Sequence, residues 1–166
     1  MFVPINGPVV ADTVYDNGIL VARDVAVTLP EVAFLTTDLQ AMGTLSLPIT
    51  QLIEHMETAL TKIGVDMGLG SIIKPDMKPL EFRWAQTVTD ANGNTKTVGC
   101  KAFIKGIPNK IPGIALTVGE AIENEITLAT TRYVLFVDGN ELIHIDRLAG
   151  IIRIDGKDYA ALENLL

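Results

Sequence analysis

The sequence predicts one mainly β domain, and three observations lead to this fold class. Turn signals recur along the chain, and strand-like sequence flanks each of them. Several flanking segments alternate apolar and polar residues, which is the period of a half-buried strand. Helical periodicity is scarce, and nothing in the 166 residues resembles a repeat, a low-complexity tract or an interdomain linker. The turn signals lie at 16–18, 91–94, 138–140 and 155–157.

In the first third of the chain, we expect strands joined by a long connection. The segment 25–35 places apolar residues at every second position, so it predicts a strand. Those residues are Val25, Val27 and Leu29. The segment 36–48 is expected to be a long connection. Residues 45–62 look extended, although their alternation is poor.

Two segments are candidates for helix. Residues 65–73 predict a short helix, and Gly68 and Gly70 lower its propensity. Near the C-terminus, Asp158 is expected to cap one or two helical turns, because Asp is a favoured N-cap residue. Those turns would carry Tyr159, Leu162, Leu165 and Leu166.

The centre of the chain predicts a long β-hairpin. Two runs of alternating apolar residues flank the turn signal Asn92-Gly93, which suits a tight hairpin connection. The run before the turn is Leu80, Phe82, Trp84 and Val88, and the run after it is Val98, Cys100, Ala102 and Ile104. A loop rich in Pro and Gly is expected to follow over 106–119.

The segment 120–137 predicts a strand that is covered on both faces over part of its length. Its even positions are apolar, whereas its odd positions begin polar and become apolar from Tyr133 onward. A half-buried strand keeps one face polar, so we expect a second subunit to supply some of the cover. The hairpin 136–146, which turns at Asp138-Gly139, is equally apolar and ends in His144 and Asp146.

Composition excludes several classes of function. Only 5% of the residues are aromatic, and the net charge is −7, so bulk attraction to nucleic acid is not expected. No apolar run reaches the roughly 20 residues of a membrane span. The N-terminus lacks the basic start of a signal peptide, and the single Cys100 cannot form an internal disulfide. We therefore expect a cytosolic protein that does not bind a membrane.

No catalytic or metal-binding constellation emerges from the sequence. His144 and Asp146 share one strand face, but no motif places a nucleophile beside them. His55 is the only other histidine, and a zinc site needs three or four convergent ligands. We expect no enzyme activity, no metal and no cofactor. The alternative from another class is a β-barrel binding module or small enzyme with a site near His144 and Asp146.

What remains is a surplus of apolar surface on a small β domain, and this surplus indicates assembly. When one surface patch binds a different patch on the next copy, the repeated contact closes into a ring or grows into a filament.

An ordered set of short motifs resembles the major tail tube proteins of contractile-tailed bacteriophages and phage-tail-like bacteriocins. Near the N-terminus, the turn Asp16-Asn17-Gly18 precedes Val27-Thr28-Leu29-Pro30, and Ala41-Met42-Gly43 falls where this family has a loop with Gly and Met. Further along, Arg132-Tyr133 precedes an Asp-Gly turn with Glu141-Leu142 and then Ile145-Asp146. A second Asp-Gly turn, Asp155-Gly156-Lys157-Asp158, follows. The resemblance spans most of the chain.

This resemblance implies a β-sandwich or half-barrel fold with one short flanking helix, in a single domain over 1–166. It also implies that six subunits form a ring, and that rings stack into a hollow tube for DNA passage. The implied partners are other copies of the chain, the tail sheath protein, the tape measure protein, the tail terminator and the baseplate tube initiator. The location would be the virion tail, assembled in the cytoplasm of a host bacterium.

Within such a tube, three groups of residues have expected roles. We expect acidic side chains to face the lumen and repel DNA: Glu123, Glu125, Glu54 and Glu57. Contacts between rings are expected from an N-terminal arm over 1–12 and a long loop over about 35–48, through Phe2, Val3, Leu35, Met42, Leu45 and Leu47. Contacts between neighbours in a ring are expected from Tyr133, Leu135, Val137, His144 and Asp146, with Asp146 fixing a local turn or a subunit contact.

A related alternative is the tube of a type VI secretion system or another injection particle, which would carry a protein effector in place of DNA. The sequence alone leaves this alternative open.

Overall fold

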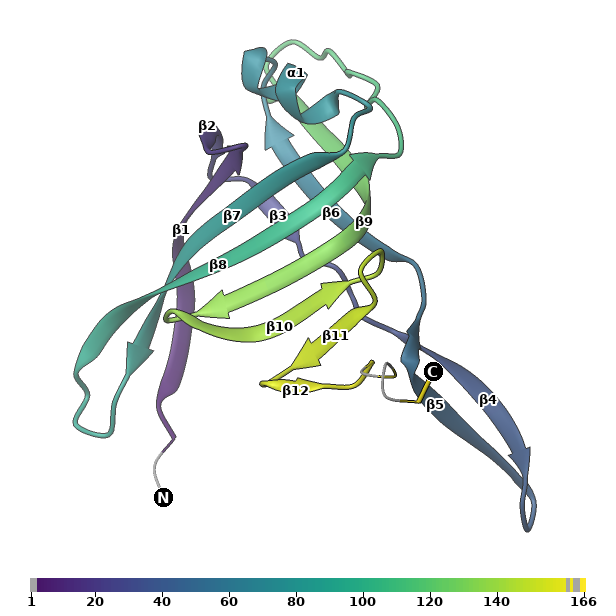
Figure 1. The fold of residues 1–166 in the computed structure, drawn as a ribbon. Coiled ribbons are helices and arrows are strands. Elements are labelled where there is room, and N and C mark those ends of the chain that lie inside the picture. The colour runs from purple at the N-terminus through teal and green to yellow at the C-terminus, as the bar shows by residue number, and fades with distance from the viewer. Residues whose placement is uncertain (1–2, 161, 163–164) are drawn as a thin grey trace.

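The computed structural model describes residues 3–160, 162, 165 and 166, and it contains mostly antiparallel β-structure. The chain runs from β1 to β6, through the short helix α1, and on to β12 (Figure 1). The elements are β1 Ile5–Asp16, β2 Ile19–Arg23, β3 Ala26–Thr28, β4 Phe34–Gln40, β5 Thr44–Ile53, β6 Met56–Ile63, α1 Met67–Ile73, β7 Lys78–Thr89, β8 Thr95–Pro108, β9 Glu123–Val137, β10 Asn140–Asp146, β11 Ile151–Ile154 and β12 Lys157–Asp158.

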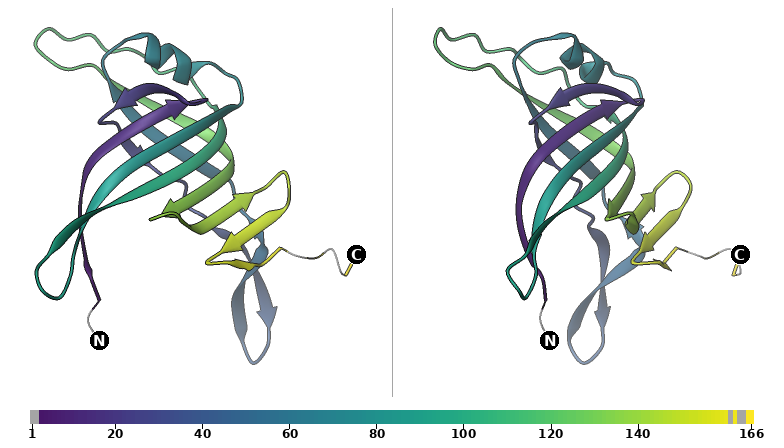
Figure 2. Two further views of the ribbon diagram at one scale, coloured as in Figure 1. Left: turned by 60° about the vertical axis from the view of Figure 1, so that its left-hand side comes forward. Right: turned by 90° about the vertical axis from the view of Figure 1, so that its left-hand side faces the viewer.

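Ten of the strands form one large sheet, and eight of them follow each other in the order β12-β11-β10-β9-β8-β7-β1-β2. The long strand β9 lets the sheet branch, because its first part pairs with β6 and its last part with β10. Strand β3 extends the branch by pairing with β6. The sheet curves into an open half-barrel (Figures 1 and 2). The expected class, mainly β with one short helix, is confirmed.

The long hairpin β7–β8 is as predicted. Its register pairs Leu80 with Ile104 and Trp84 with Cys100, so both apolar runs lie on one face. The turn is held by Asp90, whose Oδ1 accepts hydrogen bonds from the backbone N–H groups of Asn92 and Asn94, each at 2.9 Å. This hairpin forms the centre of the large sheet, between β9 and β1.

The concave face of the half-barrel carries the main hydrophobic core. Residues from β1, β2, α1 and four further strands, β6 to β9, pack there with Val25, and most are nearly inaccessible to solvent. The buried members are Val14, Ala22, Val25, Leu60, Leu69, Ile72, Leu80, Phe82, Ala102, Ile104, Ile126, Leu128 and Tyr133. A smaller cluster under β10 and β11 contains Ile53, Met56, Ile145 and Ile152. The opposite face of the large sheet is called the outer face below.

A β-bulge moves the core-facing residues of β9 from even to odd positions. The register with β8 shifts between Lys105 and Gly106, so Thr131 has no partner on β8. Before the bulge the even residues, such as Ile126 and Leu128, face the core, and after it Tyr133 does so. A bulge inserts one extra residue and thereby reverses the alternation. After the bulge, Tyr133 and Leu135 face the core, whereas Val134 and Phe136 lie on the outer face. This part of β9 is thus apolar on both faces, and cover of its outer face by a second subunit stays a prediction.

Two expected irregular segments are strands. The predicted connection 36–48 is most of the hairpin β4–β5, whose turn contains Met42 and Gly43 with positive φ angles of 54° and 118°. Residues 5–12 of the expected N-terminal arm belong to β1 and pair with β7. In the N-terminal segment polar and apolar residues do not alternate regularly, whereas residues 44–49 alternate strictly and carry a strand pattern that the prediction of a connection overlooked.

The C-terminal segment corrects a further prediction. Lys157 and Asp158 form the two-residue strand β12 against β11, in place of the start of a helix. Asp158 does cap locally, because its Oδ1 accepts a hydrogen bond from Ala160 N at 2.9 Å. Residues 161, 163 and 164 of the predicted helical turns lie outside the described residues. Among the residues that are described, no helix is long and apolar enough to cross a membrane.

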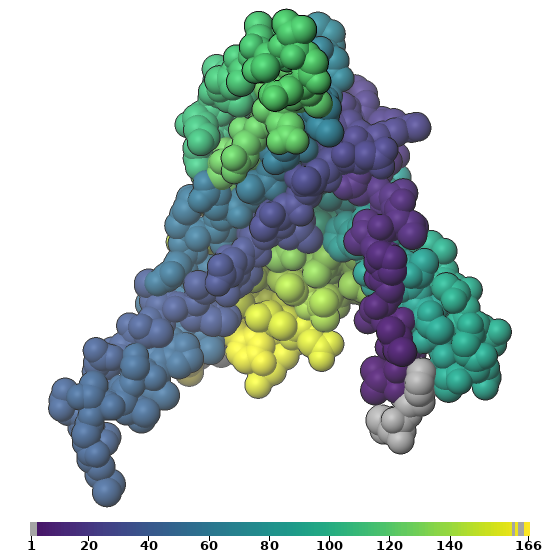
Figure 3. All heavy atoms as spheres, turned by 180° about the vertical axis from the view of Figure 1, so that it is seen from behind, coloured from purple at the N-terminus to yellow at the C-terminus, as the bar shows by residue number. Residues whose placement is uncertain are grey.

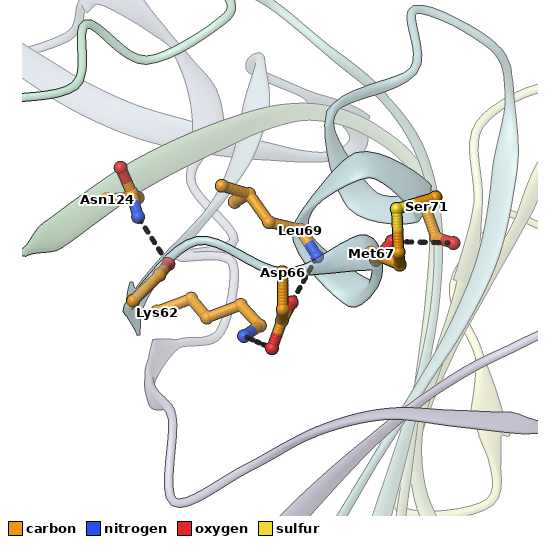
Figure 4. A network of polar contacts seen from close by, with 7 residues as sticks. Lys62, Asp66, Met67, Leu69, Ser71 and Asn124 are labelled. Carbon is orange, nitrogen blue, oxygen red and sulfur yellow. Dashed lines mark hydrogen bonds and ion pairs between the residues drawn. The ribbon is translucent and has the colours of Figure 1, made fainter.

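Helix α1 is anchored at both ends by lysines that are almost fully buried, and Figure 4 shows the contacts at its start. At its start, Asp66 Oδ1 accepts a hydrogen bond from Leu69 N at 2.9 Å, and Asp66 Oδ2 pairs with Lys62 Nζ at 2.7 Å. At its end, Lys78 Nζ donates to the carbonyl oxygen of Ile72 at 2.6 Å. Cations suit the carbonyl end of a helix, so the two lysines fix α1 over the core.

We predict that Asp66→Ala lowers the free energy of unfolding by about 1–2 kcal/mol, because it removes the N-cap and the partner of Lys62. The Lys62 side chain and the Leu69 N–H hold the pKa of Asp66 below its usual range. A lowered folded-state pKa gives stability that is present above the unfolded-state pKa and is lost as pH falls through the folded-state value. Urea titrations should therefore show the full difference in unfolding free energy between the wild type and Asp66→Ala at pH 7, and a smaller difference in strongly acidic solution. Asp38→Ala, at an exposed position, is the control; equal losses from both variants would contradict the prediction.

Candidate assembly surfaces

The hairpin β4–β5 is a separate sheet of two strands that projects from the body (Figures 1 and 3). It is attached at its base, where Phe34 and Ile53 are paired and pack into the smaller core cluster. Beyond the base, the side chains are exposed on both faces of the hairpin. A two-stranded sheet is marginally stable by itself in water. This segment therefore gains most from being covered by another molecule.

The two faces of β4–β5 differ sharply in polarity. The register pairs Leu39 with Leu45 and Thr37 with Leu47. One face thus gathers aliphatic side chains: Leu35, Leu39, Leu45, Leu47 and Ile49. The opposite face carries Thr36, Asp38, Gln40, Thr44, Ser46 and Pro48. The first set is called the apolar hairpin face below, and three residues expected at ring contacts, Leu35, Leu45 and Leu47, lie on it.

The other residues expected between rings are also exposed where they are described. Met42 is at the tip of the hairpin and is fully exposed. Val3 is 71% exposed, and Phe2 lies outside the described residues. These positions are compatible with contacts to another subunit.

The residues expected between neighbours in a ring divide into two groups. Tyr133 is buried in the main core, and Leu135 is half-buried against the same core. Val137 and His144 are half-buried. Val134, also buried, lies on the outer face between Phe103 and His144, to which it is paired.

Asp146 and His144 do not form a catalytic pair. Asp146 Oδ1 accepts hydrogen bonds from Leu148 N at 3.0 Å and Ala149 N at 3.1 Å, and so fixes the turn between β10 and β11. His144 Nδ1 lies 3.4 Å from Glu141 Oε1, which also contacts Arg153 Nη1 at 3.4 Å. These are polar contacts among neighbouring strands. Within the part of the chain that the structure describes, no group of three or more His, Cys, Asp or Glu side chains could hold a metal ion.

Three of the four acidic residues expected to face a lumen share the outer face of β6 and β9. Glu57 is paired with Ala129, and Glu125 with Thr61, while Glu123 begins β9. All three are exposed. Glu54 precedes β6 and lies outside any strand, with its backbone N–H bonded to the carbonyl of Ala33. The structure thus brings Glu57, Glu123 and Glu125 onto one surface and leaves Glu54 apart.

Sequence reasoning missed the cations on this surface. Lys101 and Lys105 of β8 and Arg132 of β9 are exposed on the outer face, and Lys105 is paired directly with Arg132. Arg83 of β7 is also there, bonded to Glu81 and stacked 4.3 Å from the centre of the Tyr15 ring. Only the strand register places these distant residues together. The outer face is therefore acidic near the start of β9 and carries both positive and negative side chains at its centre.

Comparison with known proteins identifies the class of protein. The family model described as phage tail tube protein FII matches residues 10–163. A search of curated proteins finds no match. One similar solved chain belongs to the cryo-EM structure of PVC, an extracellular contractile injection system, described as its sheath–tube complex in the extended state. It has a TM-score of 0.53 and 14% identity, covering 79% of this chain and 91% of that one.

A second similar chain comes from the PVC sheath/tube terminator in the extended state, with a TM-score of 0.53 and 13% identity, covering 78% of this chain and 95% of that one. At these identities the likeness shows the fold. The family match covers nearly the whole chain, and it confirms the resemblance found in the sequence. The chain belongs to the phage tail tube protein FII family, so it is a structural subunit of a tail tube and not an enzyme.

Proposed function

We propose that six copies of this chain form a ring and that the rings stack into a hollow tube through which DNA passes. Membership of the tail tube family and the apolar hairpin face are the observations that support this proposal. An exposed aliphatic face on a projecting hairpin is costly in a free monomer. Stacking the rings would cover it and lengthen the tube in the same step.

Unpaired sheet edges support the closed ring. Strand β2 pairs with β1 only over Thr13–Asp16, so residues 5–12 of β1 leave one edge open. The other end of the sheet is the two-residue strand β12. Exposed edges are liable to uncontrolled pairing. Joining the edges of neighbouring subunits around a ring removes this liability and yields one continuous inner barrel.

The outer face of β6 and β9 is our candidate for the lumen. Its glutamates, Glu57, Glu123 and Glu125, would repel the phosphate backbone, and this repulsion keeps DNA from adhering to the wall. We propose that Glu54 adds a fourth negative charge at the margin of this lumen surface.

The partners follow from this role. The sheath surrounds the tube, a tape measure protein sets its length, a terminator closes one end, and a baseplate initiator starts the other. The similarity to chains from the PVC sheath–tube complex and from the PVC sheath/tube terminator supports the first and third of these partners. The tube is assembled in the cytoplasm of the host bacterium and becomes part of the tail, without contact with a membrane.

A second candidate is the tube of an injection particle that carries a protein. The same two PVC chains favour it, because PVC is an extracellular contractile injection system. The mixed charge at the centre of the outer face also suits a protein cargo as well as DNA.

Negative-stain electron microscopy over a range of protein concentrations tests the proposal. We expect six-fold rings at low concentration and hollow tubes as the concentration rises, because stacking is a bimolecular step. Particles that remain single subunits at every concentration would count against assembly from this chain alone. Filaments without a central channel would count against a conduit.

A further inference from the structure

The loop between β8 and β9 forms a second apolar surface that the proposed function does not use. It lies with α1 at one end of the molecule, whereas the β4–β5 hairpin projects at the opposite end (Figures 1 and 3). Its aliphatic side chains are strongly exposed: Ile111 by 66%, Ile114 by 49%, Leu116 by 78% and Val118 by 104%. Residues 109–118 are called the apolar loop below.

The backbone of the apolar loop makes few bonds to its own subunit. Residues 110–117 lie in no helix or strand, and within the described residues none of their backbone N–H groups donates to another backbone carbonyl. At its start, Asn109 N donates to Thr127 O at 2.9 Å and ties the loop to β9, and near its end Glu120 N donates to Thr117 O at 3.2 Å and closes a local turn.

The side-chain spacing of the loop suits a flat apolar partner. Ile114, Leu116 and Val118 recur at every second position, so an extended backbone places all three on one side. The apolar hairpin face is such a flat apolar surface, because its leucines lie side by side across two strands. Both surfaces are aliphatic, and a contact between them would remove both from water.

Charge does not oppose this contact. Residues 34–53 contain a single ionisable side chain, Asp38, and the loop contains a single one, Lys110, of opposite sign. Because the loop and the hairpin lie at opposite ends of the subunit, they cannot cover each other within one chain. In a head-to-tail arrangement, the loop of one copy covers the hairpin of the next. Each copy then still has one free loop and one free hairpin for further copies, so the assembly can grow without limit.

We propose that the apolar loop of each subunit receives the apolar hairpin face of a subunit in the adjacent ring. This inference rests on the proposed function and supplies the missing half of its ring-to-ring contact. The partner of the hairpin is a second copy of this chain, and its binding surface is residues 109–118. All rings in the tube then have the same orientation, with every β4–β5 hairpin pointing toward the same end of the tube.

Thiol cross-linking of the full chain tests the contact. The variant that carries both Met42→Cys and Leu116→Cys, treated with a short bismaleimide, should give a ladder of dimers, trimers and larger species on a denaturing gel. Each single variant should give dimers at most, because a head-to-tail chain needs both sites. The native Cys100 is only 2% exposed, and the unmodified protein therefore serves as the background.

A charge substitution gives an independent readout. Leu116→Asp should raise the protein concentration needed for tube growth by about tenfold or more, because the carboxylate loses its hydration at the contact. Leu148→Asp is the matched control, since Leu148 is 77% exposed and belongs to neither surface. It should leave that concentration within about twofold of the wild-type value.

The outcomes separate this inference from the proposed function. Tubes that form in the microscope but give no ladder, or that tolerate Leu116→Asp, would overturn the loop contact and leave the tube intact. Strong dimers from Met42→Cys alone, without larger species in the double variant, would show hairpin-to-hairpin pairing and overturn it as well. Monomers in both experiments would overturn the inference for the purified chain and would count against assembly of the tube from this chain alone.

Discussion

Replacing Leu45 and Leu47 together by aspartate abolishes tube growth at concentrations where the wild-type protein assembles. Both leucines lie on the apolar hairpin face and are exposed in the free subunit. Without the partial burial of these two leucines, the free energy of assembly becomes less favourable by about 3 kcal/mol. This change raises the concentration needed for assembly about a hundredfold. Sedimentation of tubes across a dilution series measures the shift.

The matched control lies between them on the same strand. Ser46→Asp adds one carboxylate to the polar face of β5, beside Asp38, with which Ser46 is paired. This variant should assemble within a few fold of the wild-type concentration. Both proteins should keep the same far-UV circular dichroism, since the hairpin lies outside the large sheet. Equal assembly defects in the two variants would show that charge in general, and not loss of the apolar face, is responsible.

Leu128→Ala should destabilise the subunit by about 2–5 kcal/mol, the range for a large apolar side chain removed from a packed core. Leu128 has no exposed surface and lies in the main core, where β9 passes between β6 and β8. Urea denaturation below the concentration of tube growth gives the free energy of unfolding without a contribution from assembly.

Leu148→Ala is the control for this change, because the same atoms are removed from a position that is 77% exposed. It should alter the free energy of unfolding by less than about 0.5 kcal/mol. A small loss from Leu128→Ala would mean that the concave face is loosely packed, and the half-barrel would then not be the folded core of an isolated subunit.

The parts of the fold that the sequence predicted well are those where local pattern and burial agree. The hairpin β7–β8 combines a turn signal with two long alternating runs, and both runs face the core. Helix α1 begins at an Asp N-cap, and two of its apolar residues, Leu69 and Ile72, are buried. In these segments one residue pattern is enough, because the partner surface lies within the same chain.

The errors arise where another element sets the structure. The apolar odd face of β9 results from the bulge at Thr131, which no local pattern in β9 reveals. The hairpin β4–β5 was expected to be a connection, because its aliphatic face meets no core in its own subunit and its Ala-Met-Gly turn is a weak hairpin signal. The apolar loop was predicted as irregular, but its role as a surface depends on its distance from the hairpin, and that distance is a property of the fold.

Cryo-electron microscopy of tubes grown from the purified chain tests the central claim most directly. The account predicts a hollow tube of stacked six-fold rings, with Leu45 and Leu47 buried against residues 109–118 of a subunit in the next ring and with Glu57, Glu123 and Glu125 lining the channel. A tube in which the apolar hairpin face remains in solvent, or in which the outer face of β6 and β9 points away from the channel, would contradict it.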